Sequence, residues 1–173
     1  MRALPLLAGL ALTGLGAATS ADWTVYLKRL GPVEYGMTVA EANRLPGVRL
    51  EVPTGFNDYA PCGWAFPQDT TTGLAFMTDG DRIMRGDVTR LGVRTASGVG
   101  VGSTAADVRR AYGQKVWEQP HLYGRGATDL LMMYDPYEPG DEAYRVVFNV
   151  FDDTVRSLSS GLLPHVMAPE GCI

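Results

Sequence analysis

The sequence contains few residues of the kinds that usually carry out catalysis or bind metals. Its 173 residues include two cysteines and two histidines, His121 and His165. The histidines lie far apart in the chain, and neither has a second ligand at the spacing of a zinc site. A G-x-S-x-G motif that would activate a serine is also missing. These absences predict a protein that is not an enzyme and that has no catalytic residues, no metal and no cofactor.

One glycine-rich stretch points to a cofactor and needs a separate explanation. Gly100, Gly102 and Ala105 match the G-x-G-x-x-A pattern ahead of a predicted helix. Dinucleotide sites place that pattern between a strand and a helix of a parallel β-α-β unit. The helix predicted here is short and no such unit surrounds it. We therefore interpret the glycines as part of a connector.

Runs of positive charge are equally scarce. No basic cluster exceeds two residues, and the chain has a net charge of −4. Contacts with nucleic-acid phosphates or with an anionic membrane need denser basic patches. The charge pattern therefore predicts no nucleic-acid partner.

The amino-terminal residues 1–21 have the pattern of a secretory signal peptide. Arg2 precedes an apolar run over residues 4–15, and small residues follow up to Ala21. No cysteine lies near the expected cleavage site, so the attachment point of a lipid-anchored lipoprotein is missing. We expect a periplasmic or secreted protein without membrane insertion after cleavage. The alternative is an uncleaved anchor helix, for which the apolar run is short.

The two cysteines, Cys62 and Cys172, are an even number in a compartment that permits disulfides. We expect them to be bonded to each other, and the alternative is two free thiols. A disulfide between them would close a loop of about 110 residues and would stabilise the folded protein by about 4 to 5 kcal/mol in chain-entropy models.

A similar stretch occurs twice in the sequence. Residues 36–47 (GMTVAEANRLPG) and 102–113 (GSTAADVRRAYG) align without gaps. In each, a threonine is followed three positions later by an acid: Thr38 by Glu41, and Thr104 by Asp107. This is the spacing of a capping box, and a glycine suited to a helix end closes each stretch. The pattern predicts two short helices, over residues 39–45 and 105–112.

Alternating apolar residues and turn signals predict strands around both helices. The clearest is residues 144–151, where Val146, Phe148 and Val150 alternate with Arg145 and Asn149. The other predicted strands cover residues 23–30, 48–52, 62–66, 73–77, 82–88, 115–118, 130–134 and 154–159.

We expect an α+β fold made of two tandem units, each a short helix followed by a three- or four-stranded antiparallel meander, with the helices on one face of one sheet. We expect the first unit to cover residues 22–95 and the second residues 96–173, fused into one globular body.

The helix starts and meanders resemble the beta-lactamase inhibitory protein and, more distantly, the small outer-membrane barrel-assembly lipoproteins. Residues 35–38 (YGMT) fit that pattern well, whereas Ser103 replaces the methionine in the second unit. Residues 120–123 (PHLY) and the terminal EGC also resemble a group of exported bacterial proteins without an assigned function. The resemblance implies binding through the open, concave face of the sheet.

Acidic residues gather at the predicted turns. Asp79 and Asp81, like Asp152 and Asp153, lie at hairpin turns, where aspartate is common for local hydrogen bonding. The loop over residues 135–142 is acidic as well, and it could be solvated or could attract a basic partner.

Aromatic residues supply the remaining candidates for a site. Large amphipathic side chains often anchor a binding surface. The candidate binding residues are Tyr59, Trp64, Trp117, Tyr123, Tyr134 and Tyr137. The leading hypothesis is an exported, non-catalytic module that binds a protein or envelope component through its open sheet face. The alternatives are a periplasmic hydrolase or lyase that uses acidic residues and His121, and a sugar-binding protein that uses Trp64 or Trp117.

Overall fold

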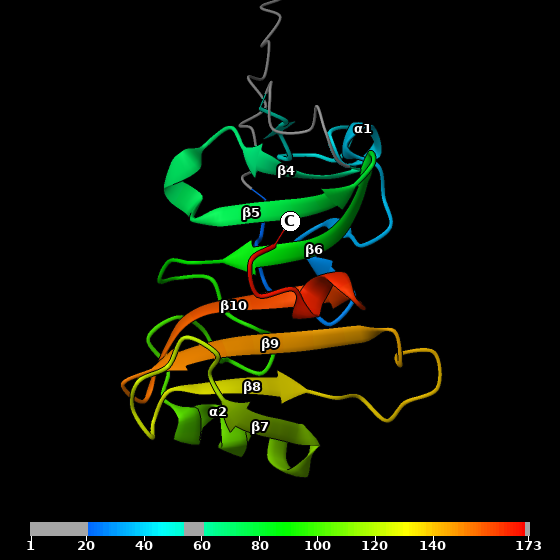
Figure 1. The fold of residues 1–173 in the computed structure, drawn as a ribbon. Coiled ribbons are helices and arrows are strands. Elements are labelled where there is room, and N and C mark those ends of the chain that lie inside the picture. Colours follow the sequence, from blue (N-terminus) through cyan, green and yellow to red (C-terminus); the bar gives the residue numbers. More distant parts are fainter. Residues whose placement is uncertain (1–20, 54–60, 172–173) are drawn as a thin grey trace, which may run out of the picture.

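One large antiparallel sheet dominates the structure, a computed structural model that describes residues 21–53 and 61–171. Its eight strands lie in the order β3-β4-β5-β6-β10-β9-β8-β7, and Figure 1 shows β6 beside β10 at its centre. The strands are β3 (Leu50–Glu51), β4 (Cys62–Pro67), β5 (Leu74–Asp79), β6 (Arg82–Val88), β7 (Val116–Pro120), β8 (Leu130–Tyr134), β9 (Tyr144–Phe151) and β10 (Thr154–Leu162).

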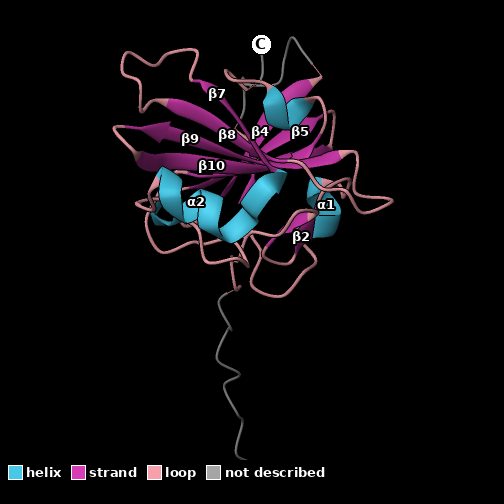
Figure 2. Ribbon diagram, turned by 90° about the horizontal axis from the view of Figure 1, so that it is seen from below, coloured by secondary structure: helices cyan, strands magenta, loops and turns pink. Residues whose placement is uncertain are grey.

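The remaining elements are short. A two-stranded sheet pairs β1 (Arg29–Leu30) with β2 (Val33–Glu34). Two α-helices are described, α1 (Val39–Ala42) and α2 (Ala105–Tyr112). The described part of the chain also contains three 3₁₀ helices: η1 (Thr70–Thr72), η2 (Gly113–Lys115) and η3 (His165–Met167). Figure 2 shows α1, α2 and β2 on one side of the large sheet. We call the opposite side the open face.

The predicted α+β class of two helix-plus-meander units is wrong. The structure is mainly β, with one continuous eight-stranded sheet and a single helix of more than one turn, α2, among the described residues. The sheet is continuous because β6 pairs directly with β10, Asp87 lying opposite Ser159. A helix of four residues is too short to form a layer of its own.

The first helix is shorter than predicted because Asn43 ends it. The Asn43 side chain donates to the carbonyl of Leu50 at 2.9 Å and accepts from the amide of Leu50. These bonds connect the end of α1 to the start of β3, seven residues further on. The predicted strand over residues 23–30 is also wrong, because only Arg29–Leu30 forms a strand and Val25 makes isolated bridges to Leu30 and Thr95.

Several local predictions are confirmed. Both capping boxes are present, with Thr38 and Thr104 each accepting the amide of the acid three residues on. The predicted bounds of α2, β6, β8 and β9 agree with the structure. Local sequence signals were sufficient for these elements.

The hydrophobic core lies between the sheet and the helices. On β9, Val146, Phe148 and Val150 face this core and are almost completely buried. At the centre of the sheet, Gly86 leaves room for the core, since a Cβ there would lie 2.8 Å from Leu30 Cδ2. None of the helices in the described part of the chain is both long and apolar enough to span a membrane.

Candidate functional site: a pocket on the open face

Strand pairing arranges the open face in rows that cross the sheet. One row contains Asp87 on β6, Ser159 on β10 and Val147 on β9. The next row contains Ser157 on β10 opposite Asn149 on β9, then Leu131 on β8 and Gln119 on β7. Residues two apart along a strand share a face. The polar side chains of β6, β9 and β10 therefore meet on the open face near its centre.

A β-bulge in β10 places the two serines. The register shifts between Val155 and Ser157, which leaves the residue between them without a regular partner. As a result Val155 and Leu158 both enter the core with no exposed surface. Ser157 and Ser159 turn to the open face.

The open face carries a pocket of about 600 Å³. Its floor is formed by strands β4 to β10, and residues 166–170 of the C-terminal segment line it from above. Figure 1 shows that the segment after β10 crosses in front of β6 and β10. The main apolar lining residues are Trp64, Phe66, Leu131, Val147, Val166 and Met167, and the main polar ones are Arg85, Asp87, His121, Asn149, Ser157 and Ser159.

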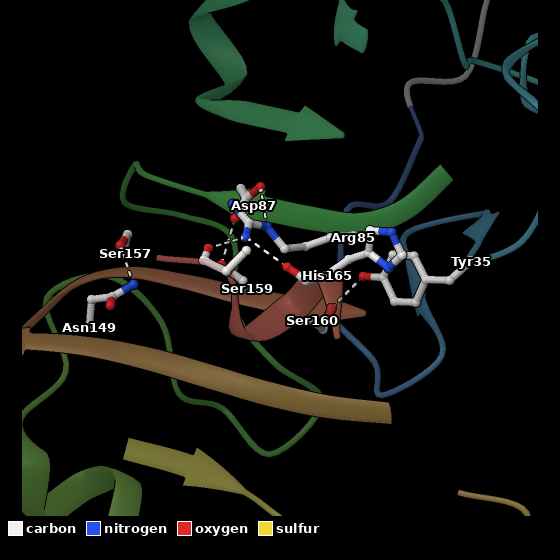
Figure 3. A network of polar contacts seen from close by, with 9 residues as sticks. Tyr35, Arg85, Asp87, Asn149, Ser157, Ser159, Ser160 and His165 are labelled. Atoms are coloured by element: carbon white, nitrogen blue, oxygen red, sulfur yellow. Dashed lines mark hydrogen bonds and ion pairs between the residues drawn. The ribbon is translucent and has the colours of Figure 1, made fainter. Parts of the chain in front are cut away.

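A buried ion pair lies in the pocket floor (Figure 3). Arg85 Nε is 3.0 Å from Asp87 Oδ2, and Ser159 donates its hydroxyl hydrogen to the other carboxylate oxygen. Burial raises the pKa of the Asp87 carboxyl, while Arg85 and the Ser159 hydrogen bond act in the opposite direction. The charges of the pair therefore balance each other inside the pocket.

Arg85 also holds the C-terminal segment over the pocket. Its Nη1 donates to the carbonyl oxygens of His165 at 3.0 Å and Ala168 at 2.8 Å. The guanidinium lies 5.5 Å from the centre of the Trp64 ring, within the range of a cation–π contact. One side chain thus connects the sheet, an aromatic wall and the roof.

A chain of hydrogen bonds crosses the other half of the pocket. The backbone amide of Tyr123 donates to His121 Nδ1 at 3.1 Å. His121 Nε2 lies 2.9 Å from Asn149 Oδ1, and Asn149 Nδ2 lies 3.0 Å from Ser157 Oγ. The His121 ring also packs on Phe151, with the ring centres 4.3 Å apart. This packing fixes the orientation of the His121 imidazole in the series of hydrogen bonds.

The outer rim joins the loop after β7 to the C-terminal segment. The Tyr123 hydroxyl donates to Glu170, and Leu122 beside it is 73% exposed. The hydrogen bond and the neighbouring carboxylate raise the pKa of the Tyr123 hydroxyl. This contact joins the two segments at the rim of the pocket.

The structure does not gather the six predicted aromatic residues into one patch. Trp64 lines the pocket and Tyr123 lies at its rim, but Trp117 is 48% exposed on the edge strand, outside the lining residues. Tyr134 faces the helices, its ring 4.9 Å from that of Tyr112. Tyr137 lies in an exposed loop over Lys115.

The other predicted residues have varied positions. Tyr59 and Cys172 lie outside the described residues, and Cys62 is disulfide-bonded. His165 lies 3.3 Å from Asp79, at the far end of the sheet from His121. Groups of three or more histidine, cysteine, aspartate or glutamate residues that could hold a metal do not occur among residues 21–53 and 61–171.

The acidic residues at turns have structural roles. Asp152 and Asp153 adopt positive φ angles of 50° and 56° in the turn between β9 and β10. In the acidic loop, Glu138 pairs with Lys115 at 2.6 Å and Asp135 with Arg145 at 2.8 Å. Lys115 and Arg145 partly neutralise these two loop acids, which weakens the attraction of the loop for a basic partner.

Sequence reasoning missed Arg85, Asp87 and Asn149. A signal for the first two was present: an arginine and an aspartate two residues apart within a predicted strand must share one face. Two opposite charges on one face of a strand at the sheet centre indicate a buried pair. The position of Asn149 depends on pairing with β10, which the local sequence does not show.

No family model, no curated protein and no solved structure matches this chain. The resemblance to the beta-lactamase inhibitory protein and to the barrel-assembly lipoproteins therefore stays a prediction from the sequence.

Proposed function

We propose that this protein is an exported, non-catalytic binding module that takes a small envelope component into the pocket on its open sheet face. The export rests on the amino-terminal sequence. The observation that supports binding is the pocket itself. Its volume of about 600 Å³ and its apolar walls with a few converging polar groups are typical of small-molecule sites.

The polar groups of the pocket favour binding over hydrolysis. A serine nucleophile needs a base within hydrogen-bond reach of its hydroxyl. Here Asn149 stands between His121 and Ser157, and an amide cannot take up the proton. His121 also uses both ring nitrogens in hydrogen bonds. The pocket acids are Asp87 and Glu170, not the acids of the predicted turns and of the loop over residues 135–142 that the sequence analysis singled out.

A binding experiment with an uncharged fluorescent probe tests the proposal. N-phenyl-1-naphthylamine fluoresces more strongly in an apolar site, so it reports occupancy without a charge of its own. We expect saturable binding to the mature protein. Leu131→Trp, which places an indole in the pocket, should weaken binding about tenfold or more, equivalent to about 1.4 kcal/mol.

The matched control is Leu91→Trp, because Leu91 is 74% exposed and does not line the pocket. Gln119→Trp at the pocket edge serves as a second filling variant if Leu131→Trp does not fold. Absence of saturable binding, or equal binding by all three variants, overturns the proposal. Turnover of p-nitrophenyl butyrate that Ser157→Ala abolishes would support the hydrolase instead.

A further inference from the structure

The hydrogen-bond chain in the pocket has a fixed direction. A backbone N–H can only donate, so the Tyr123 amide makes His121 Nδ1 an acceptor. An imidazole that accepts at Nδ1 has its hydrogen on Nε2 and donates it to Asn149 Oδ1. The amide group of Asn149 then points its NH₂ at Ser157 Oγ. Ser157 Oγ therefore accepts one hydrogen bond, from the Asn149 side chain.

The Ser157 hydroxyl hydrogen is the donor that this chain leaves over. A serine hydroxyl has one hydrogen and two lone pairs, and Asn149 occupies a lone pair. Ser157 lines the pocket and is half-buried, so its hydrogen is available to a molecule inside. Ser159 differs, because its hydrogen is already donated to Asp87. The pocket thus presents a hydroxyl donor at Ser157 and a hydroxyl acceptor at Ser159.

The two buried charged groups of the pocket are already engaged with each other. Arg85 Nε and Nη1 bind Asp87 and two backbone carbonyls, and both carboxylate oxygens of Asp87 accept hydrogen bonds. Glu170 accepts from Tyr123 at the rim. A buried charged ligand group needs an opposite charge or several hydrogen bonds to offset its lost hydration. Among the described lining residues, Arg85 and Asp87 offset each other's charge, and Glu170 is exposed to solvent at the rim.

We infer that the ligand of this pocket is an uncharged, mostly apolar molecule that presents a hydrogen-bond acceptor, such as an amide or ketone carbonyl, to the Ser157 hydroxyl. This inference rests on the proposed function and specifies its ligand class. The apolar body packs on Phe66, Leu131, Val147 and Met167, and the carbonyl accepts from Ser157. An anionic head group would meet Arg85 already paired with Asp87, and a cationic one would meet Asp87 already paired with Arg85, while Glu170 is exposed to solvent at the rim.

Three ligands that share an alkyl chain but differ in their head groups test the inference. Octanamide, octanoate and octylamine are added at pH 7 to compete with N-phenyl-1-naphthylamine for the mature protein. At this pH the amide is neutral, the acid is anionic and the amine is cationic. We expect octanamide to displace the probe at a concentration about tenfold lower than either charged analogue, a difference of about 1.4 kcal/mol.

Removal of one hydroxyl separates the carbonyl contact from general apolar binding. Ser157→Ala should weaken octanamide about fivefold, the size of one hydrogen bond, with the probe affinity measured separately for each variant. Thr128→Ala, at an exposed position outside the pocket lining, is the control and should bind octanamide normally. Ser157→Thr keeps the hydroxyl and should restore affinity.

The outcomes distinguish this inference from the proposed function. Failure of the probe itself to bind overturns both. Probe binding together with octanoate or octylamine as tight as octanamide overturns the ligand class and leaves the pocket proposal standing. Unchanged octanamide affinity in Ser157→Ala overturns the role of the serine hydroxyl.

Discussion

Arg85 and Asp87 lie two residues apart on β6 and pair on the open face, with 3.0 Å between Arg85 Nε and Asp87 Oδ2. Both are buried, at 6% and 9% exposure. Because Arg85 also binds the carbonyls of His165 and Ala168, the pair connects the centre of the sheet to the roof of the pocket. The ion pair thus supports both the fold and the site.

Arg85→Met should destabilise the protein strongly. The change leaves Asp87 buried without its counter-charge and releases two carbonyls of the C-terminal segment. Breaking a buried pair from one side costs about 3–5 kcal/mol, which urea unfolding would measure. The double variant Arg85→Met/Asp87→Leu should recover part of this loss, since it leaves no unpaired charge. A loss below about 1 kcal/mol in the single variant, the value of an exposed pair, would show that the pair is not important for stability.

Tyr35→Phe should destabilise the protein through a contact on the core side of the sheet. The Tyr35 hydroxyl is bonded to Ser160, which has no exposed surface, and burial raises the pKa of the tyrosine. Without that hydroxyl, Ser160 Oγ is left buried and unsatisfied, at a cost of about 1–3 kcal/mol in the free energy of unfolding.

Two further variants check this explanation. Tyr137→Phe removes the same atom from an exposed loop and should leave stability unchanged. Tyr35→Phe/Ser160→Ala removes both partners and should be more stable than Tyr35→Phe alone. If the double variant is less stable, the unsatisfied serine is not the cause.

Local sequence signals predicted elements better than arrangement. The alternation in β9 and the capping box at Thr104 each depend on residues close in the chain, so they identified β9 and α2 correctly. The helix start at Thr38 was also correct, but its length was not, because Asn43 binds Leu50 across a turn. The pairing of β6 with β10 joins residues about 70 positions apart in sequence, and the bulge in β10 is visible only against β9.

The site was predicted only in part for the same reason. Trp64 and Tyr123 were chosen as large amphipathic residues; Trp64 lines the pocket, and Tyr123 binds the lining residue Glu170 at its rim. The choice could not separate them from Tyr134, which has the same chemistry but faces the helices. The pocket roof depends on a C-terminal segment that turns back over the sheet after β10. Nothing near residues 163–171 in the sequence indicates that Arg85 will bind it.

Thr104→Ala should weaken the start of α2. The Thr104 hydroxyl accepts from the amide of Asp107 at 3.1 Å, and the Asp107 carboxylate accepts from the amide of Thr104 at 2.8 Å. Loss of the threonine side of such a box typically costs about 1 kcal/mol of folding stability. Thermal unfolding would measure it, with Thr128→Ala as the exposed control. Equal stability of the two variants would show that packing of Ala105 and Val108 alone holds the helix.

Asp87 and Asp129 should make opposite contributions to the pH dependence of stability. The pKa of Asp129 is lowered because its carboxylate accepts the backbone amides of Asp152, Gly126 and Arg125. A lowered pKa in the folded state adds stability above the ordinary value, and this is lost as the pH falls through the folded pKa. The pKa of Asp87 is raised by burial. Its contribution is present below the ordinary value and is lost as the pH rises through the folded pKa.

Unfolding of the wild type, Asp129→Asn and Asp87→Asn between pH 7 and pH 3 tests these signs. The stability difference between wild type and Asp129→Asn should shrink below about pH 4, where an unperturbed aspartate becomes protonated. Over the same range, wild type should gain stability relative to Asp87→Asn, because the folded protein binds the Asp87 proton more tightly than the unfolded chain. Since both changes replace aspartate with asparagine, each variant is the control for the other. If both stability differences change in the same direction as the pH falls, burial does not raise the pKa of Asp87.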